Sequence, residues 1–282
     1  MASKDKLKRF RENETFTCLY QPSTQDVLGK DHPLKGNWGK EVFGNDNPIY
    51  LELGCGKGEY TIALAAAHPE CNFIGVDIKG ARLWRGAKYA TEHSMPNVAF
   101  LRTHIEFISS FFASEEVSGL WITFADPQLR RERKRLTSPM FLERYKGFLR
   151  RDGVVNLKTD SRFLHEYTKA LAIKNDLPVL YVCNDIYRGR KPEGCNDVCA
   201  YRVVPTHFEP SQVPSSLVGF PELETLLGVQ TFYEQNYLSH DIPITFLSFR
   251  PYSPAKYLSP NEDEAVKAEL TRWEDIEVAG RW

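Results

Sequence analysis

The sequence of 282 residues lacks several features that mark specialised classes of protein. It has no run of 18 uninterrupted apolar residues, so no membrane-spanning helix is expected. Residues 1–14 are charged and contain no apolar stretch of signal-peptide length. The six cysteines are too sparse in a chain of this size for a disulfide scaffold. These absences favour a soluble cytoplasmic protein with reduced thiols.

The chain also lacks a strong net charge, because 36 basic residues face 37 acidic ones and leave a formal charge of −1. Overall charge therefore does not indicate a nucleic-acid partner, and only local clusters of charge can do so. Internal repeats and low-complexity tracts are absent as well. A hydrophobic content of 42% excludes a disordered chain and is sufficient for a large core.

A strand, a tight turn and a helix are predicted around residues 49–67. The apolar run Ile49–Leu53 is followed by glycines at positions 54, 56 and 58, and then by the helix-like segment Glu59–Ala67. Glycine permits positive φ and a close approach of the backbone to a ligand, and the start of a helix offers unpaired N–H groups. A cofactor is therefore expected over this turn.

The spacing of these glycines suggests which cofactor binds. The pattern is G-x-G-x-G, whereas dinucleotide-binding turns use G-x-G-x-x-G with the pyrophosphate at the helix N-terminus. The shorter pattern favours a nucleoside without phosphates and disfavours a nicotinamide dehydrogenase. Asp77 ends a second predicted strand about 20 residues later, where a carboxylate binds ribose hydroxyls. Together these features suggest S-adenosyl-L-methionine; the alternative is a turn that only connects strand and helix.

From Ile49 onward, strand-like and helix-like segments alternate, which predicts a mostly parallel seven-stranded sheet with helices on both faces. The strands are expected at Ile49–Leu53, Asn72–Val76, Val98–Arg102, Gly119–Ala125, Val154–Lys158, Val179–Cys183 and Ile244–Arg250. The helices are expected at Glu59–Ala67, Ala81–Thr91, Glu106–Ala113 and Pro139–Leu149, and after a capping Ser161.

Three parts of the chain are expected on this basis. Residues 1–48 form a basic arm and an irregular lead-in, and residues 49–250 form the main domain, with an insertion at about 184–224. Residues 251–282 form a tail or helix. The arm carries five basic residues between Lys4 and Arg11, so it either contacts RNA phosphates or only solubilises the chain.

Acidic residues follow three of the predicted strands, at the edge where open parallel sheets bind ligands: Asp77, Asp126 and Asp160. Asp126 leads into a basic run at positions 130–135. Phosphate contacts position nucleic acids, so this run predicts contact with RNA or DNA through Arg131, Arg133, Lys134 and Arg135. The alternatives are a solvated basic face and an Asp126 that only forms an Asp-Pro turn.

The residue types that suit a zinc ion occur at Cys183, Cys195, Cys199 and His207. Their spacing lacks the paired C-x-x-C form of common zinc modules. No metal is therefore predicted.

With these residues assembled, the sequence resembles the tRNA (guanine-N7-)-methyltransferase family of the bacterial TrmB type over about residues 51–249. Five segments carry the resemblance. They are Leu51–Gly58, Phe73–Asp77, Phe124–Pro127 with the basic residues after it, Lys158–Asp160 and Thr231–Glu234. The resemblance implies a Rossmann-like class I S-adenosylmethionine-dependent methyltransferase fold. It also implies methyl transfer to N7 of a guanine in the variable loop of tRNA.

The resemblance further implies roles for single residues. Asp126 takes the place of the catalytic aspartate. The residues expected to bind the cofactor are Glu52, Gly54, Gly56, Gly58, Asp77, His104 and Asp126. Those expected to bind the substrate are Arg130, Asp160, Thr231, Phe232, Tyr233 and Glu234.

The sequence departs from the family pattern at some positions. His104 stands where the family has a third cofactor-binding acid, Glu106 is its possible substitute, and Gln128 replaces a tryptophan. Two alternatives therefore stay open: a methyltransferase acting on another substrate, and a catalytically silent tRNA-binding protein. The expected partner is tRNA, with no membrane and no required protein partner. The sequence leaves open a monomer or a homodimer.

Overall fold

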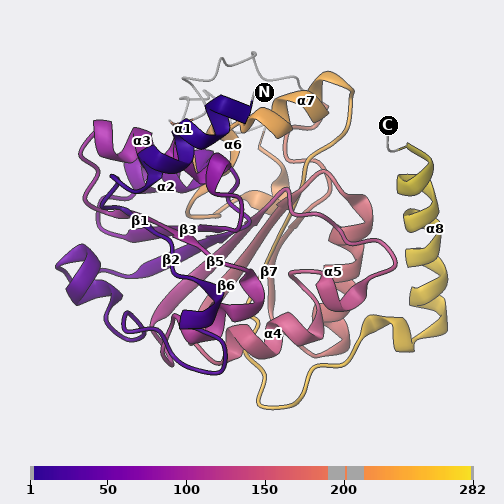
Figure 1. Cartoon of the computed structure of the whole chain (residues 1–282). Coiled ribbons are helices and arrows are strands. Elements are labelled where there is room, and N and C mark those ends of the chain that lie inside the picture. Colours follow the sequence, from indigo (N-terminus) through magenta and orange to yellow (C-terminus); the bar gives the residue numbers. More distant parts are fainter. Residues whose placement is uncertain (1–2, 190–200, 202–212, 281–282) are drawn as a thin grey trace.

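The computed structural model describes residues 3–189, 201 and 213–280 (Figure 1). In this part of the chain no helix combines the length and the apolar character needed to cross a membrane.

The centre of the molecule is one sheet in which the described residues form eight strands. In sheet order they are β1 (Leu19–Tyr20), β4 (Val98–Arg102), β3 (Asn72–Asp77), β2 (Ile49–Leu53), β5 (Val117–Thr123), β6 (Leu149–Thr159), β8 (Thr245–Phe249) and β7 (Val179–Cys183). Strands β1 to β6 pair in parallel, and β8 pairs antiparallel with both β6 and β7. All seven predicted strands are present. The sheet has one strand more than predicted, because the lead-in adds β1 at its edge.

Eight α-helices lie in the described residues: α1 (Ser3–Asn13), α2 (Glu59–Ala67), α3 (Gly80–Glu92), α4 (Pro139–Lys146), α5 (Arg162–Lys174), α6 (Leu223–Gly228), α7 (Phe232–Ser239) and α8 (Glu264–Gly280). The predicted cap of α5 is confirmed, since the Ser161 hydroxyl accepts a hydrogen bond from the Leu164 N–H. Two predicted helices differ. Residues 105–110 form a 3₁₀ helix, and α4 ends before Gly147 because Leu149 already begins β6.

The helices cover both faces of the sheet and enclose two hydrophobic cores. One core contains buried residues of α4 and α5, such as Phe141 and Leu164. The other contains buried residues of α2, α3 and α6, such as Ile62, Leu83 and Leu226. Figure 1 shows α1, α2 and α3 on one side of the sheet and α4 and α5 on the other, with α8 beside α5. Because both faces of the sheet are covered by apolar cores, polar side chains are expected at the ends of the strands.

The lead-in before β2 is more ordered and more buried than the predicted irregular arm. Trp38 is fully buried, and its indole N–H donates to the Phe111 carbonyl at 2.8 Å. Helix α1 packs on α3, where the buried Asn13 side chain donates to the Gly80 carbonyl at 2.9 Å. The composition of residues 1–48 predicted a loose segment. Composition does not reveal contacts such as these, whose partners are far apart in the chain.

Candidate functional site

Most of the predicted site residues lie at one edge of the sheet. Strands β2 to β6 are parallel neighbours, so their carboxyl ends share this edge. Hydrogen bonds join adjacent tips, from the Thr103 N–H to the Asp77 carbonyl at 3.2 Å and from the Phe124 N–H to the Lys158 carbonyl at 2.9 Å. The edge is therefore a continuous rim from β4 to β6.

The glycine turn after β2 has the conformation that its sequence predicts. Gly54, Gly56 and Gly58 all have positive φ, at 79°, 57° and 74°. A Cβ on Gly58 would lie 2.6 Å from the Phe100 ring, so packing and backbone both require glycine there. At Gly54 and Gly56 a Cβ would meet no atom within 4 Å. These two glycines border open space, as a turn that receives a ligand requires.

Asp77 is hydrogen-bonded to this turn. Its Oδ2 accepts from the Gly56 N–H at 3.0 Å, and its Oδ1 accepts from the Lys79 N–H at 2.7 Å. A carboxylate has about four acceptor sites, so both oxygens retain capacity for further donors such as ribose hydroxyls. The open turn and the adjacent carboxylate fit the nucleoside part of the predicted cofactor.

Glu52 lies below the turn and is buried. Its carboxylate accepts hydrogen bonds from the Thr61 N–H at 2.8 Å, from the Thr61 hydroxyl, and from the Thr123 hydroxyl at 2.6 Å. Burial raises the pKa of Glu52 to about 7, although these hydrogen bonds oppose the increase. Glu52 thus ties β2 to α2 and β5, and this contact supports the turn from beneath.

The uncertain third cofactor position is occupied by an exposed imidazole. His104 follows β4 at the rim and is exposed to solvent. Glu106, the considered substitute, forms an ion pair with Lys134 at 2.9 Å. His104 is the more available of the two for a ligand, whereas Glu106 connects the 3₁₀ helix to the basic run.

Asp126 lies on a strained, exposed loop after β5. Three non-glycine residues within this short segment have positive φ: Phe124 at 49°, Gln128 at 48° and Arg130 at 62°. Each costs of the order of 1–3 kcal/mol, and such outliers gather at functional sites. Asp126 Oδ1 accepts from the Gln128 N–H at 2.9 Å, so the predicted alternative of a turn-forming aspartate also describes part of its role. The turn leaves the carboxylate exposed at the rim.

Four cations of the basic run point outward. Arg130, Arg131, Arg133 and Lys134 are all exposed, as predicted contacts with a polyanion require. The run is held in place by Glu132, which accepts hydrogen bonds from the Tyr167 hydroxyl at 2.7 Å and from the Ser259 hydroxyl. The exposed charges therefore stand on a fixed support.

The prediction that Arg135 contacts RNA is wrong for this structure. Its side chain is only 3% exposed, and its guanidinium lies 4.6 Å from the Phe163 ring centre and 4.5 Å from that of Tyr167. Its Nε donates to the Pro127 carbonyl at 3.0 Å. Arg135 instead anchors the loop that carries Asp126, because two aromatic faces and a carbonyl offer the guanidinium a better place than solvent.

Helix α7 brings two aromatic side chains to the rim. Phe232 and Tyr233 are 51% and 39% exposed, and their ring centres are 5.7 Å apart. Lys57 of the glycine turn lies 4.1 Å from the Phe232 ring centre. Thr231 caps the helix through a capping box with Glu234. The segment that the family resemblance assigns to the substrate therefore begins beside the cofactor turn.

Glu234 does not reach this surface, so its predicted contact with the substrate is wrong. Its carboxylate and the ammonium of Lys158 are both 0% exposed and lie 2.8 Å apart. The Tyr187 hydroxyl donates to the same carboxylate at 2.7 Å, and Lys158 also donates to the carbonyls of Leu226 and Val229 at 2.7 and 3.1 Å. This buried cluster fastens α6 and α7 to β6. Asp160, two residues beyond Lys158, lies at the rim and is partly exposed.

Two aromatic residues near the site were not predicted from the sequence. Tyr237 stacks on Phe124 with ring centres 6.0 Å apart, next to the Asp126 loop. It follows Tyr233 by four residues, so helical spacing would have revealed it. Tyr201 stacks on Tyr89 and donates to the Lys57 carbonyl at 3.3 Å. No local signal predicted that contact, because 144 residues separate its partners.

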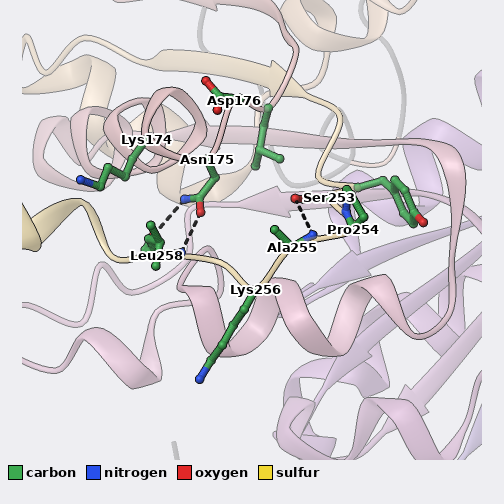
Figure 2. A pocket seen from close by; sticks show the side chains of 10 residues that line it. Lys174, Asn175, Asp176, Ser253, Pro254, Ala255, Lys256 and Leu258 are labelled. Atoms are coloured by element: carbon green, nitrogen blue, oxygen red, sulfur yellow. Dashed lines mark hydrogen bonds between the residues drawn. The ribbon is translucent and has the colours of Figure 1, made fainter.

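A hollow of about 330 Å³ lies away from this rim (Figure 2). It is lined by the end of α5, including Lys174 and Asn175, and by residues 252–256 and 258. The Asn175 amide bonds to the backbone of Leu258 across it. Since α5 begins at the carboxyl edge, its last turn lies at the opposite edge of the sheet. Chemistry and strand direction, and not the size of this hollow, locate the candidate site.

The described residues contain no group of three or more His, Cys, Asp or Glu side chains that could hold a metal ion. Of the considered zinc ligands, Cys183 is a buried free thiol. Cys195, Cys199 and His207 lie outside the described residues, so the prediction of no metal stays a prediction.

Comparisons of the sequence with known proteins support a methyltransferase. A family described as "Putative methyltransferase" matches residues 46–184. The tRNA (guanine-N(7)-)-methyltransferase of Christiangramia forsetii is 46% identical over 252 residues, which cover 89% of this chain and 99% of that protein. The enzyme of the same name from Bacteroides fragilis is 40% identical, with 95% and 90% covered. Among solved structures, the 16S rRNA (adenine(1408)-N(1))-methyltransferase from Catenulisporales acidiphilia matches with a TM-score of 0.48 and 13% identity, over 81% of this chain and 99% of that one.

Proposed function

The chain belongs to the tRNA (guanine-N(7)-)-methyltransferase family and methylates N7 of a guanine in tRNA, and we propose that its methyl donor is S-adenosyl-L-methionine and that its target lies in the variable loop. The family assignment is supported by 46% identity to the Christiangramia forsetii enzyme, 99% of which is covered by the match. The donor is supported by the open glycine turn with Asp77 beside it. The proposal that the target lies in the variable loop is supported by the resemblance of the site motifs to those of the family.

Four groups at the rim would hold the cofactor. Gly54 and Gly56 offer backbone next to open space, Asp77 offers acceptors for ribose hydroxyls, and His104 offers an exposed imidazole. When bound, S-adenosyl-L-methionine supplies an electrophilic methyl group on a positively charged sulfur. Glu52 contributes indirectly, because its contacts with α2 and β5 support the turn.

The reaction at N7 requires little acid–base chemistry from the protein. N7 carries an in-plane lone pair that acts as an acceptor, so it needs no deprotonation before it attacks. The residues at the rim therefore act mainly by aligning the base, which contributes roughly 7–11 kcal/mol in favourable systems. Asp126 accepts donor groups of the guanine or the cofactor and stabilises the positive charge that develops on the methylated ring. We assign it no proton transfer.

The aromatic residues of α7 would receive the base. Phe232 and Tyr233 are exposed beside the glycine turn, and Tyr237 lies against Phe124 beside the Asp126 loop. Bases withdrawn from a stack are commonly bound on aromatic faces. Because side chains cannot read the deep major groove of A-form RNA, the guanine must come from a loop or leave its stack.

The exposed cations after Asp126 would hold the phosphates next to that base. Arg130, Arg131, Arg133 and Lys134 lie on the loop that begins with Asp126, so phosphates bound there place the nucleotide at the rim. Asp160 would contact the substrate from the tip of the neighbouring strand β6.

The decisive experiment measures transfer of labelled methyl from S-adenosyl-L-methionine to tRNA without base modifications, followed by chemical cleavage at 7-methylguanosine. Cleavage at one variable-loop guanine supports donor, substrate and position together. Label elsewhere in the tRNA contradicts the proposed position. If no label enters, direct binding of the cofactor separates a methyltransferase for another substrate from a catalytically silent tRNA-binding protein.

A further inference from the structure

A second basic surface lies on the other side of the rim from the Asp126 loop. Helix α1 carries five basic and two acidic residues, and α3 carries three basic and one acidic, in a chain whose net charge is −1. The two helices pack against each other (Figure 1). The surface where they meet carries Lys8, Arg9 and Lys88, and we call it the α1–α3 face.

The packing of α1 on α3 neutralises an acidic side chain of this face. Glu12 accepts hydrogen bonds from the Trp84 indole N–H at 2.8 Å and from the Lys88 ammonium at 2.9 Å. These bonds lower the pKa of Glu12, which therefore stays ionised and paired. Lys6, Lys8 and Arg11 remain exposed to solvent. The α1–α3 face consequently presents an excess of positive charge.

The face is also hollowed where the two helices meet. Lys8, Arg9, Glu12, Trp84 and Lys88 line a hollow of about 270 Å³. The Arg9 guanidinium lies 4.6 Å from the Trp84 ring centre, and the Lys88 ammonium lies 5.2 Å from it. Stacking on a ring fixes the direction of a guanidinium and leaves its N–H groups available to phosphate oxygens. The hollow is therefore suited to an anionic group.

Helix α3 connects this hollow to the candidate site. Helix α3 begins three residues after Asp77, and Arg82 in its first turn lies 5.9 Å from the Tyr233 ring centre of α7. With a rise of 1.5 Å per residue, Lys88 lies about 9 Å farther along α3 than Arg82. That distance is short compared with a run of a few nucleotides. One continuous RNA segment can reach from the aromatic residues to the hollow.

We propose that the α1–α3 face binds the sugar–phosphate backbone of the substrate tRNA outside the nucleotide that is methylated, with Lys8 and Arg9 as its outer contacts. This inference rests on the proposed function. The loop after Asp126 packs through Leu129 on the core that contains α4 and α5, whereas α3 belongs to the other core. The two basic surfaces therefore lie on opposite faces of the sheet, and the tRNA crosses the rim between them.

The test compares two double variants of the full chain. Lys8→Gln with Arg9→Gln removes two charges of the α1–α3 face and keeps side chains of similar length. Lys174→Gln with Lys256→Gln is the matched control, because it removes two charges at the hollow in Figure 2, at the opposite edge of the sheet. The measurements are the tRNA Kd from 50 to 300 mM salt, the S-adenosyl-L-methionine Kd and the thermal unfolding midpoint.

If the face binds phosphates, the Lys8 and Arg9 variant loses about tenfold in tRNA affinity near 0.15 M salt, and the slope of log Kd against log salt falls by about 1.5. Its cofactor Kd and unfolding midpoint stay unchanged, and the control changes neither tRNA Kd nor slope. Unchanged tRNA Kd and slope in the Lys8 and Arg9 variant overturn the inference, as does an equal loss in the control. Wild-type methyl transfer is assayed in parallel: its absence, with the binding result as expected, contradicts the proposed function and leaves the α1–α3 face supported.

Discussion

The buried pair of Lys158 and Glu234 allows a sharp test of how α7 is held. Lys158→Met keeps the length of the side chain and removes its charge, so that Glu234 loses its ionic partner in a site with no solvent exposure. Removing one member of a buried ion pair costs about 3–5 kcal/mol. A typical domain has a total stability of about 5–15 kcal/mol, so this loss is readily measured.

The loss should depend on pH in a defined direction. Burial already raises the pKa of Glu234, and Lys158 opposes that increase. Without Lys158 the folded pKa rises further above the unfolded value. The protonated carboxyl is then favoured in the fold, so the variant keeps most stability below about pH 4.3 and loses it as the pH rises. The destabilisation by Lys158→Met should therefore be larger at pH 8 than at pH 5.

The assay is equilibrium urea unfolding of the wild type, Lys158→Met, Glu234→Gln and the double variant at both pH values. Glutamine at position 234 still completes the capping box with Thr231 and carries no charge, so the double variant should recover part of the loss at pH 8. A cost below 1 kcal/mol for Lys158→Met at pH 8, or the same cost at pH 5, would refute the reasoning. Variants that still fold should bind tRNA more weakly, because Phe232 and Tyr233 lose their support.

Three further predictions concern the rim and the residues beneath it. Glu52→Gln should remove a pH dependence of stability. Because the pKa of Glu52 is about 7 in the fold and 4.5 in the unfolded chain, Glu52 stabilises the wild type below pH 4.5, and this contribution of about 3 kcal/mol is lost as the pH rises past 7; parallel profiles of stability against pH for the two proteins, measured by urea unfolding, would contradict this. Gly56→Ala should fold and lose cofactor affinity, as a cofactor titration would measure. Gly58→Ala should be the more strongly destabilised of the two because its Cβ would lie 2.6 Å from the Phe100 ring, and equal unfolding midpoints would contradict this. Asp126→Asn should lower kcat by roughly a hundredfold without adding an acidic limb to the pH–rate profile, and an acidic limb that tracks Asp126 would show instead that it acts as a base.

The candidate site divides into residues that local patterns predicted and residues that they misplaced. Positive φ at the three glycines, Asp77 beside the turn and Asp126 after β5 follow from short motifs at strand ends. Arg135 was predicted to contact RNA because it belongs to the basic run, and Glu234 was predicted to bind the substrate because of the family resemblance. In the structure both are buried, against Phe163 and Tyr167 in one case and Lys158 and Tyr187 in the other. Their partners lie 28 to 76 residues away in the chain, where local patterns carry no information.

The sequence by itself determined the alternation of strands and helices, the glycine turn and the order of the family motifs. Each of these depends on neighbouring residues, through hydrophobic periodicity, backbone freedom and helix capping. Only the tertiary structure decided which charges face solvent, that α1 packs on α3 to form a basic surface, and that Tyr201 and Tyr237 approach the site. These features depend on contacts between distant segments, because the energy of a charged or aromatic side chain is set by the groups that fold around it.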